Sequence, residues 1–216
     1  MGRIRGGFPA DVAGHRPSCR LMRKVVPAMT RIVLISGSLR PQSTSELVAR
    51  WCAARCREGG ATAEVVPGTA LQFPFYRSGV ADGDPAVRAY LDALRAADGV
   101  VLISPTYHGT VSGLLKNALD YVNELTTPRA YLDGVPVGCV AIGAGAQGTA
   151  STLGTLRTIA HAVRAWPTPL GVTLHAWAEG TDTAEQILRQ QRLTTMTGQV
   201  LLMATSLGLA QPAVPS

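Results

Sequence analysis

A short apolar segment that ends at a glycine and opens into a hydroxyl-rich loop constrains the fold of this chain most strongly. Residues 32–36, IVLIS, are apolar or small throughout, which predicts a strand buried on both faces. Residues 46–58 follow as a predicted helix, so residues 37–45, the first loop, lie between a strand end and a helix start. The unpaired N–H groups of a first helical turn favour an anion at such a junction.

The side chains of the first loop suit an anion of a particular kind. Ser38, Ser43, Thr44 and Ser45 offer hydroxyl donors, and Arg40 adds a permanently charged planar group that matches phosphate oxygens. We therefore interpret the loop as a phosphate site, with a solvated serine-rich turn as the plain alternative. The chain contains no GxxxxGK[ST] motif, which disfavours a nucleoside-triphosphate hydrolase.

The rest of the chain alternates between strands and helices. Further strands are predicted at residues 62–66, 100–104, 135–142 and 169–175, and further helices at residues 85–98, 113–125, 149–166 and 183–207. Five strands alternating with five helices predict the α/β class, with a doubly wound parallel sheet, helices on both faces and right-handed crossovers. Ligands of such sheets bind at the carboxyl ends of the strands, where the strand order reverses.

Two more loops leave predicted strand ends at that edge. Residues 105–112, the second loop, begin with Pro105 and expose Tyr107 and His108, which could border a ring system. His108 is either an acid or base, or a hydrogen-bonding or packed side chain, whereas His161 and His175 are assigned to structure. We expect this loop to meet the first loop and residues 143–148, the third loop, around one ligand.

The third loop, GAGAQG, matches the GxGxxG pattern of dinucleotide-binding folds but lacks their context. It follows the fourth predicted strand rather than the first, and about 20 residues later the chain has Trp166, Pro167 and Thr168 instead of a carboxylate for a ribose hydroxyl. We interpret these glycines as allowing the backbone to approach the edge of a flat ligand.

Composition and charge narrow the class of protein. The chain has 216 residues, 46% of them hydrophobic, which is enough for one domain with a sizeable core. Of the formal net charge of +6, residues 1–30 carry +5, so the remainder is nearly neutral and a nucleic-acid partner is disfavoured. No apolar run reaches the roughly 18 residues needed to cross a bilayer, and the N-terminus shows no secretory signal. We expect a soluble cytoplasmic protein with no membrane partner.

The four cysteines do not suit a metal or redox site. Cys19, Cys52, Cys56 and Cys139 form no CxxC pair and no zinc spacing. Cys52 and Cys56 lie one helical turn apart on an apolar face that includes Trp51. We predict buried structural thiols, no disulfide and no metal.

We divide the chain into a flexible basic arm (residues 1–29), one domain (residues 30–208) and a tail (residues 209–216). The arm mixes glycine, proline and arginine without a period. Met29 stands just before the first strand, so the arm is either the product of an upstream start codon or a real extension. Within the domain, residues 67–83 form a long connection whose aromatic residues either pack beneath it or cover a ligand as a lid.

The sequence resembles the NAD(P)H-dependent FMN reductases of the flavodoxin-like superfamily over residues 30–180. The resemblance rests on GSLRPQSTS in the first loop and SPTYHGTVSGLLKNALDYV around the second. In that family the pattern GSxRxxSxN binds the FMN phosphate, which implies this role for Gly37, Ser38, Arg40 and Ser43. Ser45 stands where asparagine is usual, and His108 often corresponds to asparagine as well.

The resemblance also implies how the ring of FMN would be held. The family's P-x-Y-x-G loop lies along the isoalloxazine ring, and its glycine-rich loop approaches the pyrimidine side of that ring. Lys116 and Asp120 match the helix motif LKNALD, and a fold-stabilising ion pair explains them as well as a site role does. The residues assigned to cofactor binding are Ser38, Arg40, Ser43, Thr44, Ser45, Pro105, Thr106, Tyr107, His108, Gly109, Gly143, Gly145, Gln147 and Gly148.

The function implied by the resemblance is that of an FMN-dependent oxidoreductase with a flavodoxin-like fold. Hydride would pass from NADPH or NADH to bound FMN and on to free flavin, a quinone, an azo compound or a similar acceptor, without a titratable catalytic residue. The implied partners are the nicotinamide cofactor, a small-molecule acceptor, a flavin-dependent monooxygenase as recipient of reduced flavin, and further copies of the chain in a homodimer or homotetramer. The alternatives are a flavodoxin-type electron carrier without nicotinamide turnover, usually strongly acidic, and a scaffold that has lost flavin.

Overall fold

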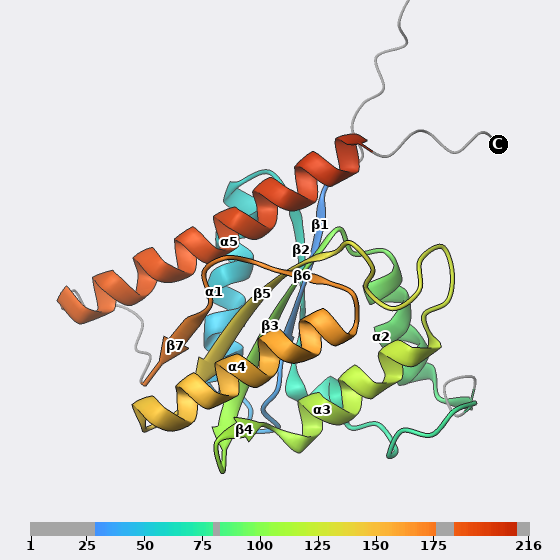
Figure 1. Cartoon of the computed structure of the whole chain (residues 1–216), viewed down its shortest axis with the longest axis horizontal. Coiled ribbons are helices and arrows are strands. Elements are labelled where there is room, and N and C mark those ends of the chain that lie inside the picture. The colour runs from blue at the N-terminus through green and yellow to red at the C-terminus, as the bar shows by residue number, and fades with distance from the viewer. Residues whose placement is uncertain (1–28, 80–82, 176–183, 211–216) are drawn as a thin grey trace, which may run out of the picture.

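The computed structural model of the chain describes residues 29–79, 83–175 and 184–210 (Figure 1). The helices and strands, in chain order, are β1 (Arg31–Ser36), α1 (Thr44–Glu58), β2 (Thr62–Val66), the 3₁₀ turn η1 (Gly68–Leu71), α2 (Pro85–Arg95), β3 (Gly99–Tyr107), β4 (Thr110–Val111), α3 (Gly113–Asp120), the 3₁₀ turn η3 (Tyr121–Glu124), β5 (Pro136–Ile142), α4 (Ala146–Ala162), β6 (Trp166–Pro167), β7 (Val172–Leu174) and α5 (Ala184–Ala210).

The strands form one largely parallel sheet in the order β2-β1-β3-β5-β6, with β7 also paired to β5 and the short β4 antiparallel to β3. Helices α2, α3 and α4 cover one face, and α1 and α5 cover the other (Figure 1). The chain moves from β1 to β2 on one side and then returns to β3 on the other side of β1. The predicted α/β doubly wound parallel sheet is therefore confirmed, and its strand order reverses between β1 and β3.

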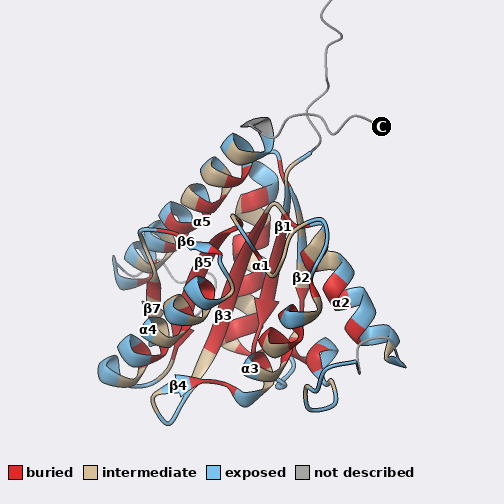
Figure 2. Cartoon of the chain, turned by 45° about the vertical axis from the view of Figure 1, so that its right-hand side comes forward, coloured by how far each residue is buried: buried red, intermediate tan, exposed pale blue. Residues whose placement is uncertain are grey.

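Strand β1 shows why the central strands must be apolar throughout. Ile32 and Leu34 face the layer of α1 and α5, whereas Val33 and Ile35 face the layer of α2, α3 and α4. Each of these four side chains is at most 3% exposed. Figure 2 shows the buried strands between helices whose outer faces are exposed. Two cores, one on each face, thus fix the sheet and the positions of its strand ends.

The three described cysteines belong to these cores. Cys52 and Cys56 lie on the inner face of α1 and Cys139 lies in β5, all as free buried thiols. Burial raises the pKa of Cys56 to about 11 and that of Cys139 to about 12. Both thiols therefore stay protonated and unreactive at neutral pH. The predicted structural role is confirmed for these three residues, while Cys19 lies outside the described part of the chain.

Strand β3 is longer than predicted. The sequence predicts an end at Ser104 because a proline follows, but the strand continues through Pro105, which pairs with Ile142 of β5, to Tyr107. Proline removes one N–H donor, yet its fixed φ of about −65° still fits an extended chain near a strand end. The strand then turns back as β4, so most of the second loop is a β-hairpin.

The later helix bounds also differ from the predicted ones. Helix α3 ends at Asp120 and continues as η3, and α4 begins at Ala146 and ends at Ala162, three residues earlier than predicted at its start and four at its end. The predicted last strand, residues 169–175, is present as the shorter β7, and an additional short strand, β6, precedes it; both pair with β5. Helix α5 continues to Ala210, and Thr183 of the predicted capping box lies outside the described residues.

Two of the three aromatic residues of the long connection, Phe73 and Tyr76, pack against the core, whereas Phe75 is 91% exposed. The rings of Phe73 and Tyr76 lie 5.5 and 5.2 Å from the ring of Tyr121 in edge-on contacts. Asn117 of α3 accepts a hydrogen bond from the Tyr76 backbone N–H (2.9 Å) and donates to the Pro74 carbonyl (3.0 Å). These contacts fasten the described part of the connection to α3 and η3.

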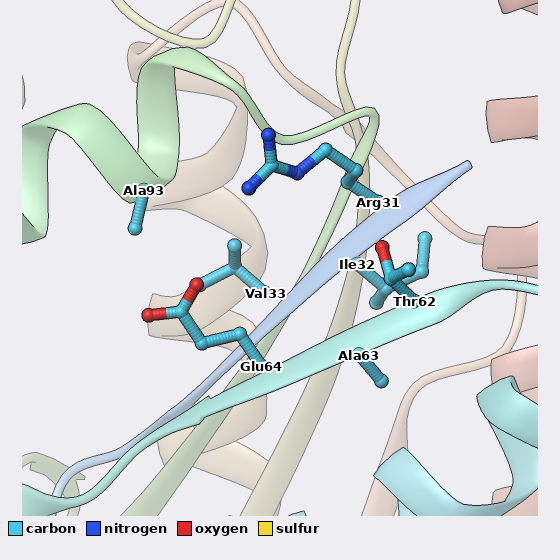
Figure 3. A pocket seen from close by; sticks show the side chains of 7 residues that line it. All are labelled: Arg31, Ile32, Val33, Thr62, Ala63, Glu64 and Ala93. Carbon is cyan, nitrogen blue, oxygen red and sulfur yellow. The ribbon is translucent and has the colours of Figure 1, made fainter. Parts of the chain in front are cut away.

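Strand β2 forms one edge of the sheet. Arg57 of α1 donates from Nη2 to the Ala63 carbonyl oxygen on this strand at 2.6 Å. At the amino ends of β1 and β2, Arg31, Val33 and Glu64 point toward Ala93 of α2 around a small pocket of about 110 Å³ (Figure 3). Among the described residues, no helix is long and apolar enough to cross a membrane.

Candidate functional site

The three loops singled out in the sequence leave adjacent strands at one edge of the sheet. Strand β3 pairs with β1 through Ile103 and Ser36, and with β5 through Pro105 and Ile142, so their carboxyl ends lie side by side (Figure 1). This edge is opposite to the amino-end pocket of Figure 3, whose volume is below the several hundred Å³ typical of a cofactor site. The predicted convergence of the three loops is therefore observed.

One serine joins the first loop to the second. The Ser112 hydroxyl donates to the Gly37 carbonyl at 2.7 Å and accepts the Leu115 backbone N–H at 3.2 Å as the N-cap of α3. A Cβ on Gly37 would lie 2.9 Å from the Ser112 Oγ and 3.0 Å from the Leu115 Cβ. The first loop thus leaves the sheet pressed against the start of α3. Sequence reasoning did not identify Ser112 as a functional residue, although an N-cap serine before an apolar helix is a recognisable signal.

The first loop runs directly into a capped helix. Helix α1 begins at Thr44, two residues earlier than predicted, so Thr44 and Ser45 belong to its first turn. Ser43 is the N-cap, and its hydroxyl accepts the Glu46 backbone N–H at 3.3 Å. This hydroxyl was expected to serve the phosphate and already has a structural role, although its proton remains available as a donor.

The donors that the first loop leaves free suit a phosphate. Ser38 and Ser45 are only 8% and 2% exposed, and their hydroxyls have no hydrogen-bond partner in the described part of the chain. The exposed Arg40 guanidinium likewise makes no ion pair with the residues that the structure describes. These hydroxyls are not among the buried unpartnered atoms of the described residues, so they stay accessible as donors beside a helix N-terminus and a guanidinium, which suits an anionic group. The residues present therefore fit the phosphate of FMN.

A glycine outside the three loops lies in direct backbone contact with the first loop. A Cβ on Gly68, in η1, would lie 1.9 Å from the Ser38 carbonyl oxygen, so the two backbones touch. Sequence reasoning missed this residue because a single Gly after a strand reads only as a turn signal, and its partner lies 30 positions earlier in the chain.

The second loop is a hairpin whose tip carries two residues with positive φ. Thr106 pairs with Val111 and Tyr107 with Thr110, leaving His108 (φ 51°) and Gly109 (φ 79°) as the two central residues of a type I′ turn. Tyr107 is 54% exposed and His108 is exposed as well, as predicted. The hairpin gives the loop a more rigid backbone than an irregular connection would have.

The third loop leads into a helix that has no side-chain cap. Gly145 is the N-cap of α4 without a hydrogen-bonding side chain, and the first turn, which includes Gln147 and Gly148, contains no acidic residue. A Cβ on Gly145 would meet nothing within 4 Å, so the backbone there faces open space. The predicted role of this loop, letting a flat group approach the main chain, requires such open space and stays a prediction.

Glycines also bring the second and third loops together. A Cβ on Gly143 would lie 2.9 Å from the Thr106 Cβ, and one on Gly148 would lie 3.2 Å from the Thr106 Cγ2. The Thr106 Oγ1 is buried and has no hydrogen-bond partner among the described residues. Thr106 is thus enclosed between the second and third loops.

Three further residues singled out by the sequence, Lys116, Asp120 and His175, make structural contacts, whereas the structural role assigned to His161 has no side-chain hydrogen bond or ion pair among the described residues to support it. Lys116 and Asp120 form an ion pair of 2.6 Å on the outer side of α3, which supports the fold-stabilising interpretation. His175 lies within 3.3 Å of the Gly143 carbonyl oxygen through Nδ1 and so supports the third loop, while His161 is exposed on α4.

Comparison with known proteins identifies the family. A family model described as NADPH-dependent FMN reductase matches residues 30–179. The chain belongs to this family. It is 30% identical over 145 residues to an NADPH azoreductase of Bacillus sp. (strain OY1-2), covering 67% of this chain and 76% of that protein. It is 36% identical over 110 residues to a quinone reductase of Escherichia coli (strain K12), covering 50% of this chain and only 56% of that protein.

The fold is similar to that of a flavodoxin. A flavodoxin from Pseudomonas aeruginosa superposes with a TM-score of 0.53 at 18% identity, covering 79% of this chain and 99% of that one. The predicted flavodoxin-like fold is therefore confirmed, as is the predicted family of flavin-dependent NAD(P)H oxidoreductases with FMN as cofactor. The fold alone does not separate reductase from carrier, whereas the family match does.

Proposed function

We propose that this protein holds FMN at the three strand ends, with its phosphate in the first loop and its ring between the hairpin and the third loop. Bound FMN would supply the redox chemistry, taking a hydride from NADPH or NADH and reducing free flavin, a quinone or an azo compound. The observation that carries the proposal is the set of unpartnered donors in the first loop, Ser38, Ser45 and Arg40, beside the start of α1. The azoreductase and quinone reductase relatives support the choice of acceptor.

The chain's own residues perform binding and orientation. Arg40 would offset the charge of the phosphate, and the two hydroxyls would donate hydrogen bonds to it, which fixes the position of the cofactor along the site. The backbone N–H groups at the start of α4 would face the polar edge of the ring and stabilise negative charge there, because no acidic residue lies in that turn. Tyr107 would border the ring from the hairpin.

Replacing Arg40 tests the phosphate assignment. Hydrogen bonds to charged groups contribute about 1.5 to 3 kcal/mol, so we expect Arg40→Ala to weaken FMN binding by about 10- to 100-fold. Binding of riboflavin, which lacks the phosphate, should be unchanged. Arg192→Ala, an exposed arginine on α5, is the matched control. Fluorescence titration of the apoprotein measures both ligands, and equal losses for FMN and riboflavin would contradict the assignment.

An NADPH oxidation assay distinguishes a reductase from the two alternatives, the electron carrier and the scaffold. We expect the purified holoprotein to oxidise NADPH steadily with a soluble quinone and no protein partner. A carrier would bind FMN without such turnover, and a scaffold would bind no flavin. Comparing free FMN, quinones and azo dyes as acceptors would then identify the substrate class, including whether reduced flavin is released for a monooxygenase.

Assembly and location complete the proposal. We propose a cytoplasmic homodimer or homotetramer, on the strength of the family resemblance and the absence of a membrane-spanning helix among the described residues. Light scattering coupled to size-exclusion chromatography measures the mass in solution. A monomer at micromolar concentration would contradict the oligomer.

A further inference from the structure

The tip of the first loop has an unusual backbone conformation. The Ser43 N–H donates to the Arg40 carbonyl at 3.2 Å, which closes a four-residue turn over Pro41 and Gln42. Gln42 has a φ of 53°. A proline in the second position and a positive φ in the third are the marks of a type II turn, whose third position normally takes glycine or asparagine. Glutamine is strained there, so another contact must hold the turn.

Glu46 provides that contact. Its Oε2 accepts the Gln42 backbone N–H at 3.1 Å, while its own backbone N–H is capped by the Ser43 hydroxyl. In an ordinary capping box the carboxylate accepts from the N-cap residue itself. Here Ser43 already donates to Arg40, and the carboxylate reaches one residue further to the strained position. The Gln42 N–H belongs to the central peptide of the turn, whose orientation distinguishes type II from type I.

The charge of Glu46 makes its position notable. Its side chain is only 11% exposed and lies in the first turn of the helix whose N-terminus would receive a phosphate, where a second negative charge is unfavourable. Arg50 offsets part of this charge, with its Nη2 2.6 Å from the Glu46 Oε1. A carboxylate beside an anion site weakens anion binding through charge repulsion. Its presence there calls for a second role that offsets this loss of affinity.

We propose that Glu46 is a positioning residue for phosphate recognition, which rests on the proposed function. By accepting the Gln42 N–H it holds the Pro41–Gln42 peptide in the type II orientation, and this orientation keeps Arg40, the first residue of the turn, at the mouth of the first loop. A simple helix cap would contribute stability alone. A positioning role also sets how strongly the protein prefers FMN to riboflavin.

The test compares two flavins in substituted apoproteins. Glu46→Ala should lower FMN affinity about tenfold and change riboflavin affinity by less than about twofold, because only the phosphate meets Arg40. Glu46→Gln keeps an acceptor oxygen and removes the charge, so its FMN affinity should equal or exceed that of the wild type. A Glu46→Gln protein as weak as Glu46→Ala would overturn the proposal, since charge and not the hydrogen bond would then be responsible.

Two double substitutions make the test independent of stability. Glycine tolerates positive φ, so adding Gln42→Gly to Glu46→Ala should restore most of the FMN affinity; a lost helix cap would not be rescued in this way. In an Arg40→Ala background, Glu46→Ala should leave the ratio of FMN to riboflavin affinity unchanged. Lack of rescue, or a full effect in that background, would overturn the inference. A wild-type protein that does not prefer FMN to riboflavin would instead overturn the proposed function.

Discussion

Two helices begin at the same edge of the sheet, and their N-termini are built in opposite ways. The start of α1 is closed by the protein's own groups, with Ser43 as cap and the Glu46 carboxylate in the first turn. The start of α4 has a glycine as N-cap, no side-chain cap and no acidic residue. An N-terminus that is already capped relies on side chains for anion binding, here Arg40 and the neighbouring hydroxyls. An uncapped one offers its backbone N–H groups directly, which suits the polar edge of a ring.

This difference predicts that substitutions near α1 change the affinity for FMN relative to that for riboflavin, whereas substitutions near α4 change both affinities by the same factor.

The largest effect on stability is expected for Gly68→Ala. A Cβ at 1.9 Å from the Ser38 carbonyl oxygen forces the first loop to move. We expect a loss of about 3 kcal/mol of stability, near the upper end for overpacking, a Tm lower by roughly 6 to 12 °C, and a reduced preference for FMN.

The control for Gly68→Ala is Gly154→Ala on the exposed side of α4, where a Cβ would meet nothing within 4 Å. Alanine in a helix interior should raise stability by about 0.5 to 1 kcal/mol. Thermal denaturation of the apoproteins measures both. An unchanged Tm for Gly68→Ala would show that the first loop does not depend on this contact.

The next largest effect on stability is expected for replacing Ser112, the N-cap of α3, and it should exceed the effect of replacing Ser43, the N-cap of α1. Ser112→Ala removes the cap of α3 and leaves the buried Gly37 carbonyl without its donor, so we expect a cost of about 2 kcal/mol. Ser43→Ala removes only the cap of α1 and should cost about 1 kcal/mol. Urea unfolding measures the difference, and equal costs would argue against a link between the first and second loops through Ser112.

The smallest effect on stability is expected for Gly145→Ala. Its φ of −118° suits any residue and its Cβ would face open space, so the free energy of unfolding should change by less than about 0.5 kcal/mol. The new methyl group should nevertheless weaken FMN and riboflavin binding by the same factor, because it would stand between the third loop and the ring. Weaker binding of FMN alone would place the phosphate, not the ring, at α4.

Much of the architecture follows from local sequence patterns. The apolar run before Gly37 and the alternation of strands with helices were sufficient to predict the sheet, its two-sided core and the edge where the loops meet. The errors fall where local signals mislead. Pro105 looked like the end of a strand that in fact continues into a hairpin, and the glycines of the third loop hid the start of α4.

Two of the residues that sequence reasoning missed, Gly68 and Ser112, act through contacts between segments far apart in the chain, whereas Glu46 contacts a residue only four positions earlier. Gly68 supports Ser38 from another strand's connection, Ser112 reaches Gly37 across two loops, and Glu46 matters because Gln42 adopts a positive φ. None of these residues belongs to a motif that specifies its partner. The roles of Gly68 and Ser112 depend on which segments the folded sheet brings together, and single-sequence patterns do not contain that information. The role of Glu46 depends on the local backbone conformation of Gln42, which the sequence pattern does not indicate because glutamine rarely adopts a positive φ.

The contact between Arg57 and the Ala63 carbonyl affects the tendency of this protein to aggregate through the edge of its sheet. A strand at the end of a sheet presents main-chain groups on which a foreign strand can grow, the first step toward amyloid-like assembly. The guanidinium occupies one of these acceptors, and the neighbouring Glu64 adds a charge that a docking strand would have to bury. The open side of this sheet is thereby made a poor template for aggregation.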